Sequence, residues 1–176
     1  MGAPEKLFAE LKQFFDQDGV KYTVVNESDN LMRLAFAPTS SKEGGGVRTR
    51  VLIDLDEVQE RDGSCTVHYA CLSAGKCEES KIPEAIVRIN GLNKRFRWVK
   101  FWFDDSDNTI NADADSVIFP GTVGLECKQF AFRMSDIVED ALIDLRDIFT
   151  PDDGGGDTPS RDDLLALLEA LRSMVG

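Results

Sequence analysis

The segment that most constrains the fold covers residues 97–115 and reads RWVKFWFDDSDNTINADAD. Hydrophobic and polar residues alternate on both sides of a turn rich in Asp, Ser and Asn, which is typical of a β-hairpin. A four-residue loop at 105–108 sets the register. Large side chains then face small ones on one side of the hairpin, as a packed core requires. The expected core pairs are Phe103 with Ile110, Phe101 with Ala112, and Val99 with Ala114.

The opposite face of this hairpin carries Trp98, Lys100 and Trp102, with Trp98 expected opposite Asp115 and Lys100 opposite Asp113. A one-residue shift would turn these acidic residues into the core, so the register with the two Trp and Lys100 facing outward is favoured. Two Trp side chains are costly to leave in water, and aromatic residues dominate binding interfaces. Either another element of the chain covers this face, or Trp98, Lys100 and Trp102 bind a partner.

The remaining pattern predicts three helices and four further strands. The helices are expected over 4–18, 81–96 and 124–149, and the strands around 20–25, 32–37, 47–55 and 65–71. The strands alternate with one polar side, which indicates an antiparallel sheet covered on one face. In the second helix, Ile82, Ile86, Ile89 and Phe96 are expected to face the core, and Gly91 is tolerable if close packing needs a missing side chain. The fold class is therefore α+β, with an antiparallel sheet of five or six strands.

Residues 1–149 form the expected domain, and residues 150–159, TPDDGGGDTP, have the composition of a flexible linker. Residues 160–176 predict an amphipathic helix whose start resembles a capping box at Ser160 and Asp163. Such a helix must bury its apolar side on its own domain, on a second copy or on a partner. The residues assigned to partner binding here are Leu164, Leu168 and Leu171.

The charge balance restricts the partners. The chain has 176 residues and a net charge of −12, which disfavours binding to nucleic acid and to anionic membranes. The acidity either serves solubility alone or favours a basic partner. The sequence has no run of 18 apolar residues and no secretory signal pattern at its start, so we expect a cytoplasmic protein.

Four cysteines and one histidine are the candidates for metal binding or catalysis. No CxxC pair is present, and Cys65 and Cys71 fall on the apolar side of one strand, so buried structural thiols are expected and no metal or cofactor. The hairpin loop from Asp105 lacks the glycine and glutamate of a calcium-binding loop. The glycines at 44–46 precede a strand rather than a helix, unlike a phosphate-binding loop. Arg48 and Arg50 could contact an acidic ligand, and a lone His68 carries no catalytic constellation.

Pro83, Asn90, Leu92, Asn93 and Phe96, followed by Phe101 and Asp104 in the hairpin, occur in an element order similar to that of the YbjN family of bacterial proteins. That family carries a provisional label of sensory transduction regulators, and its fold is similar to that of type III secretion chaperones. The resemblance covers about residues 82–149. It implies no catalytic residues.

The sequence and this resemblance together predict a non-enzymatic protein that binds another polypeptide in a regulatory or chaperone-like role. A homodimer is a further expectation, since related folds often pair. One alternative is a type III secretion chaperone for an effector. The other is an enzyme or small-ligand sensor, which would need a deep polar cavity near His68 or Arg48.

Overall fold

The computed structural model describes residues 2–37, 46–56 and 63–151. Three α-helices and seven strands occur in this part of the chain, together with a short 3-10 helix at Glu79–Lys81. In chain order, the elements are α1 (Ala3–Asp18), β1 (Thr23–Asn26), β2 (Leu31–Phe36), β3 (Thr49–Asp56), β4 (Cys65–Cys77), α2 (Ile82–Arg95), β5 (Lys100–Asp104), β6 (Thr109–Ile118), α3 (Val123–Asp144) and β7 (Phe149–Pro151).

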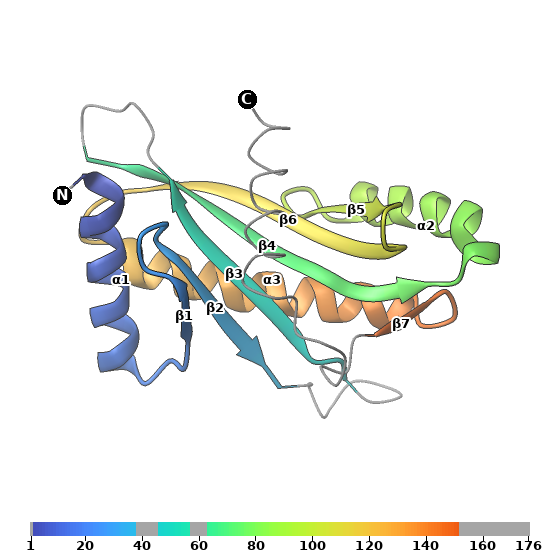
Figure 1. The fold of residues 1–176 in the computed structure, drawn as a ribbon, viewed down its shortest axis with the longest axis horizontal. Coiled ribbons are helices and arrows are strands. Elements are labelled where there is room, and N and C mark those ends of the chain that lie inside the picture. The colour runs from blue at the N-terminus through green and yellow to red at the C-terminus, as the bar shows by residue number, and fades with distance from the viewer. Residues whose placement is uncertain (1, 38–45, 57–62, 152–176) are drawn as a thin grey trace.

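All seven strands belong to one antiparallel sheet with the order β1-β2-β3-β4-β6-β5, and β7 pairs with β4. In Figure 1, α3 runs behind the long strands, α1 stands at one end of the sheet and α2 lies near β5 at the other. The α+β class and the antiparallel sheet are confirmed. The sheet has one strand more than the five or six expected, because β7 was hidden at the end of a predicted helix.

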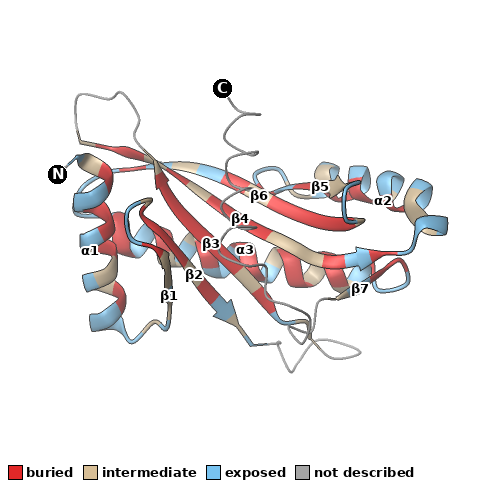
Figure 2. Ribbon diagram, in the orientation of Figure 1, coloured by how far each residue is buried: buried red, intermediate tan, exposed pale blue. Residues whose placement is uncertain are grey.

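The core lies between one face of the sheet and the helices α1 and α3, and we call this face the inner face. Figure 2 shows its buried residues along the central strands and along α3. The apolar side of α1 is buried as its spacing predicts, and Gly19 ends that helix at φ 73°. The residues of α1 and of the two central strands in this core are Leu7, Phe8, Leu11, Phe15, Val51, Ile53, Leu55, Cys65, Val67, Tyr69, Cys71 and Cys77.

The predicted hairpin register is confirmed for five pairs, from Lys100 with Asp113 to Asp104 with Thr109. Phe101 pairs with Ala112 and Phe103 with Ile110, so large residues do meet small ones. The ladder ends at Lys100, and the chain bends at 97–99 before the strand begins. The predicted pairings of Val99 with Ala114 and of Trp98 with Asp115 are therefore wrong, although Val99 is buried in the core.

The end of α3 differs from the prediction. The helix stops at Asp144 instead of continuing to 149, and Phe149–Pro151 forms β7 against Gly75–Cys77 of β4. Phe149 is buried, as predicted from its hydrophobicity, but it lies in a strand rather than in a helix. Gly75 allows this close approach, because a Cβ there would lie 3.2 Å from Phe149 Cβ and 3.3 Å from the Thr150 carbonyl oxygen. Thr150 and Pro151, assigned to the linker, are thus part of the sheet, and residues 152–176 lie outside the described residues.

The predicted core side of α2 is confirmed except at Ile86. Ile89 is buried and Ile82 and Phe96 pack against the core, whereas Ile86 is 47% exposed. Ala85 and Leu92 are the other buried residues of the helix. A Cβ at Gly91 would meet no atom within 4 Å, so close packing does not explain this glycine. Within the described ranges, no helix combines the length and the hydrophobicity needed to cross a membrane.

Candidate functional site: the outer face of the sheet

The face of the sheet opposite the core, called the outer face here, carries its own small hydrophobic cluster. Leu31, Leu52 and Ala70 come from β2, β3 and β4 and are buried together. Val25 and Leu72 pack against them, and we call these five residues the outer-face cluster. Among the residues described, no helix contributes to this cluster. Figure 1 views the sheet from this side, with α3 behind it.

A cationic pocket lies beside this cluster, toward β1. It has a volume of about 180 Å³. Three basic side chains, Lys21, Arg33 and Arg50, line it, together with Tyr22, Thr23 and Ala35. The register explains this grouping, because Arg33 pairs with Thr23 of β1 and Ala35 pairs with Arg50 of β3. In a chain with a net charge of −12, three converging cations favour an anionic ligand or an acidic segment.

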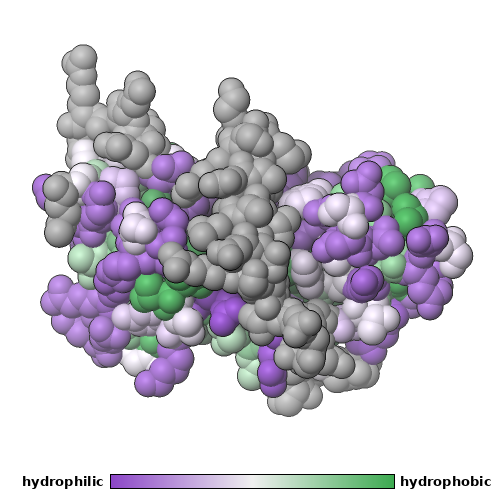
Figure 3. All heavy atoms as spheres, viewed as in Figure 1, coloured by the Kyte–Doolittle hydropathy of each residue, from purple (hydrophilic) through white to green (hydrophobic). Residues whose placement is uncertain are grey.

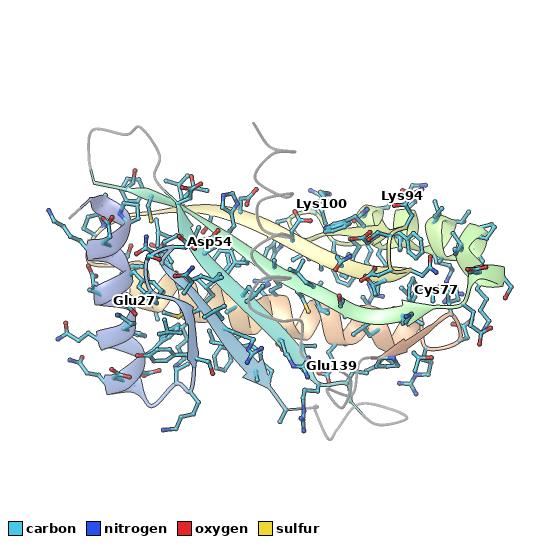
Figure 4. The ribbon with its side chains drawn as sticks, viewed as in Figure 1. Glu27, Asp54, Cys77, Lys94, Lys100 and Glu139 are labelled. Carbon is cyan, nitrogen blue, oxygen red and sulfur yellow. The ribbon has the colours of Figure 1, made fainter. Side chains whose placement is uncertain are left out.

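The opposite side of the outer-face cluster, toward β6, is acidic. His68 pairs in register with Asp54 of β3 and Asp115 of β6, and its Nδ1 contacts the Asp115 carboxylate. Figure 4 places Asp54 on β3 within the sheet. Asp113 lies one row away, and burial raises the pKa of its carboxyl, with a further rise from Asp115. This row has a histidine and an orienting carboxylate, but no nucleophile contacts His68 within the described chain.

The three hairpin residues predicted to form a binding face do not stay together. Lys100 is exposed on β5, as Figure 4 shows. Trp102 is half-buried on the same face, and its indole N–H lies near the Asp113 carboxylate without the geometry of a full hydrogen bond. Trp98 lies elsewhere, because the bend at 97–99 turns it toward α3.

Trp98 packs against α3 instead of joining the outer face. Its ring contacts Phe130 edge-on at 4.9 Å, and the Arg133 guanidinium lies 5.1 Å from its centre. It remains 37% exposed. The expectation that Trp98 shares a face with Lys100 and Trp102 is therefore wrong, whereas a binding role for any of the three stays a prediction. Leu164, Leu168 and Leu171, assigned to partner binding with them, lie outside the described residues.

The four cysteines are buried thiols, as predicted. Burial raises the pKa of Cys65 and of Cys127 to about 12 and that of Cys71 to about 11. Burial also raises the pKa of Cys77, while Lys81 lowers it. Among the described residues, no group of three or more His, Cys, Asp or Glu side chains is arranged to hold a metal ion.

Other exposed hydrophobic residues are scattered over the helices and the end of β6. Figure 3 shows a mainly hydrophilic described surface with green residues near α2, where Ile86 and Val87 are exposed. Leu125 and Phe132 are 52% and 44% exposed on α3, and Phe132 packs edge-on against Phe36 at 4.9 Å. These residues do not converge with charged groups in the way the outer face does.

The sequence contains one indication of the outer-face cluster, which is an apolar residue on the otherwise polar side of each of two strands. Leu52 lies on the polar side of its strand, between Arg50 and Asp54, and Ala70 lies on the polar side of the next strand. Neither residue indicates a site by itself. Only the register, which pairs Leu52 with Ala70, brings them together. The cationic pocket was missed for the same reason, because Lys21 and Arg33 come from other segments of the chain than Arg50.

Comparisons with known proteins add a likeness of fold. No known family matches this sequence, and no protein of curated function matches it. Among solved structures, the chain is similar to that of YbjN from E. coli, described there as a candidate transcription regulator. The two share 13% sequence identity and a TM-score of 0.48, over 82% of this chain and 96% of that chain. A likeness at this level assigns no function to this chain.

Proposed function

We propose that this chain is a binding protein for another polypeptide, in a regulatory or chaperone-like role, and that the outer face is its binding surface. The observation that carries the proposal is the outer-face cluster, which gathers apolar residues of three neighbouring strands on the side opposite α1 and α3. Leu31, Leu52 and Ala70 are buried, and apolar side chains that gather on the face of a sheet opposite its core typically belong to a contact with another segment or with a partner. The type of ligand follows from the charges that border the cluster.

Those charges have opposite signs on the two sides. Lys21, Arg33 and Arg50 border the cluster toward β1, and Asp113 and Asp115 border it toward β6. A small molecule would use one of these sides, whereas an amphipathic helix would span both. Helices bind grooves through apolar anchors spaced three or four residues apart. We therefore propose an amphipathic helical segment as the ligand, with its acidic end at the pocket.

A peptide-display selection against the immobilised full-length protein tests this proposal. The affinity of a selected peptide is then measured for wild type, for Arg33→Glu and for Lys94→Glu. Lys94 is exposed on α2, so its reversal makes the same charge change away from the outer face. We expect about tenfold weaker binding to Arg33→Glu, the loss of one charged contact, and unchanged binding to Lys94→Glu. A selection that yields no peptide sensitive to Arg33→Glu would overturn the proposal.

A small anionic ligand is the second candidate, and the pocket of three cationic side chains is the observation that favours it. Titration calorimetry with inorganic phosphate and with citrate tests it on the same variants. Saturable binding that Arg33→Glu abolishes and Lys94→Glu preserves would support a ligand sensor. Heats no larger than those of dilution would exclude these anions as ligands of the pocket.

A further inference from the structure

We infer that residues 160–176 of this chain dock on its own outer face and compete there with the partner polypeptide, an inference that rests on the proposed function for its choice of surface. The sequence of this segment predicts an amphipathic helix with four leucines on one side, at 164, 167, 168 and 171. A helix of this length is marginal alone in water. It therefore needs an apolar surface, and three features of the described residues favour the outer-face cluster.

The first feature is where the described chain ends. β6 occupies one edge of β4, so β3 and β7 share the other edge. Leu52 pairs with Ala70, Pro151 pairs with Gly75, and the register of β4 shifts between Cys71 and Gly75. Pro151 therefore lies at most about three positions beyond Arg50, within ~10 Å at the rise of a strand. The segment after Pro151 thus starts beside the cationic pocket. The eight residues at 152–159 reach up to ~28 Å when extended, enough to place Ser160 over the outer face.

The second feature is a match of charge spacing. One row of the outer face contains Arg33, Leu52, Ala70 and Asp113 on β2, β3, β4 and β6. Three strand spacings separate the cation from the carboxylate, about 14 Å. In the segment, Asp163 and Arg172 are nine residues apart, about 14 Å along a helix. Nine residues are about 2.5 turns, so Asp163 and Arg172 lie on opposite flanks of the leucine side. A helix that crosses the row obliquely can therefore place Asp163 beside Arg33 and Arg172 beside Asp113.

The third feature is the apolar surface between these charges. Leu52 and Ala70 occupy the middle of the row, with Leu31 beside them. In the segment, Leu164, Leu167, Leu168 and Leu171 lie between Asp163 and Arg172. The order along the helix is anion, apolar residues, cation. The order along the row of the sheet is cation, apolar residues, anion, so each part of the helix meets its complement when it crosses the strands in this direction. The reverse direction would place Asp163 against Asp113, and like charges repel.

This docking would regulate the binding surface. A tethered segment is present at an effective concentration on the order of millimolar, so a partner must displace it. The chain would then bind a partner more weakly than its exposed outer face could. Substitutions that detach the segment should strengthen partner binding, which separates this inference from a purely structural role.

Hydrogen exchange of the full-length protein tests the docking without any partner. We expect the amides of residues 164–171 to be protected in wild type and to exchange about tenfold faster in Arg33→Glu. Asp163→Arg should have the same effect, and the double variant Arg33→Glu with Asp163→Arg should restore protection. Lys94→Glu should leave protection unchanged. Unprotected amides in wild type, or a double variant no better than the single ones, would overturn the inference.

Two further measurements identify which segment covers the outer face. Protection that falls on dilution would overturn the inference, since a second copy would then supply the segment. The peptide selected for the outer face should bind the full-length variant Leu164→Asp/Leu168→Asp/Leu171→Asp at least about tenfold more tightly than wild type. Equal binding to both would overturn self-docking and leave the proposed function intact. A failure of both proteins to bind any selected peptide would overturn the proposed function, while protected amides at 164–171 would still support docking.

Discussion

The side chain of Asn93 hydrogen-bonds both backbone groups of Phe101: its Nδ2 donates to the Phe101 carbonyl at 2.9 Å, and its Oδ1 accepts from the Phe101 N–H at 2.8 Å. Asn93 belongs to α2 and Phe101 to β5, the edge strand of the sheet. The amide thus takes the place of a neighbouring strand. Unpaired edge groups are a template for intermolecular pairing, so Asn93 both attaches α2 and protects the edge.

The variant Asn93→Ala tests this attachment. Two hydrogen bonds to half-buried backbone groups are lost, so we expect the free energy of unfolding to fall by about 2 kcal/mol. Urea denaturation followed by circular dichroism measures the change. The control Lys94→Ala, at the exposed neighbouring position, should stay within about 0.5 kcal/mol of wild type. Equal stability of the two variants would contradict a role for the amide.

Gly124 on α3 touches the ring of Phe14 on α1. A Cβ at position 124 would lie 2.1 Å from Phe14 Cγ, so Gly124→Ala forces the two helices apart. We expect a loss of about 1–3 kcal/mol in unfolding free energy, measured by urea denaturation.

Gly91→Ala is the matched control for this substitution. It makes the same chemical change within α2, where a Cβ meets no atom within 4 Å. Alanine is favoured over glycine in a helix, so stability should rise by up to about 1 kcal/mol. A loss at both positions would show that the effect at Gly124 is not steric.

Most of the fold could be predicted from local sequence patterns. The hairpin register was predictable because turn length and the large-to-small pairing of Phe101 with Ala112 leave one favourable alignment. The helix end at Asp144 was not, because Leu145, Ile148 and Phe149 continue the helical spacing while serving a turn and a strand. Periodicity cannot distinguish a buried helix turn from a short buried strand.

The candidate site was much less predictable than the fold. Its residues come from neighbouring strands that are distant in sequence, and each follows its own strand's alternation. Trp98 illustrates the limit, because the alternation continues through it although the chain bends at 97–99 and turns the ring toward Phe130. A surface assembled by pairing across strands becomes visible only when the strand order is known.

The raised pKa of the Asp113 carboxyl predicts that the folded state becomes less stable as the pH rises. Its pKa is higher in the folded than in the unfolded state because burial and Asp115 disfavour its charge. The folded state therefore binds the proton more tightly, and stability is lost as the pH rises through the interval between the two pKa values. Asp113→Asn removes this loss. It should increase stability relative to wild type more at about pH 7 than at about pH 4, near the unfolded pKa of an aspartate.

Urea denaturation at both pH values measures this difference. Asp105→Asn, in the exposed hairpin loop, is the matched control for the same substitution away from the sheet. A variant Asp113→Asn that gains no more at neutral than at acidic pH would contradict the assignment of the shift to this carboxyl.

The buried cysteines predict an order of chemical reactivity. Thiolates react with alkylating agents, so a raised pKa and burial both slow the reaction. Cys65 and Cys127, with a pKa of about 12, should remain unmodified by iodoacetamide at about pH 8 in the folded protein. Cys77 should react first, because Lys81 opposes the rise in its pKa and its thiol hydrogen-bonds the carbonyl of the neighbouring Glu78 at 3.3 Å.

Mass spectrometry of alkylated peptides over time measures this order, and the urea-unfolded chain, in which all four cysteines should react at similar rates, is the reference. Figure 4 shows Cys77 at the end of β4, where β7 pairs with it through Phe149. Detachment of β7 would therefore expose Cys77 ahead of the core thiols. The variant Gly75→Val should push β7 away and accelerate alkylation of Cys77 without affecting Cys65. Equal acceleration at both sites would indicate global unfolding instead of local detachment of β7.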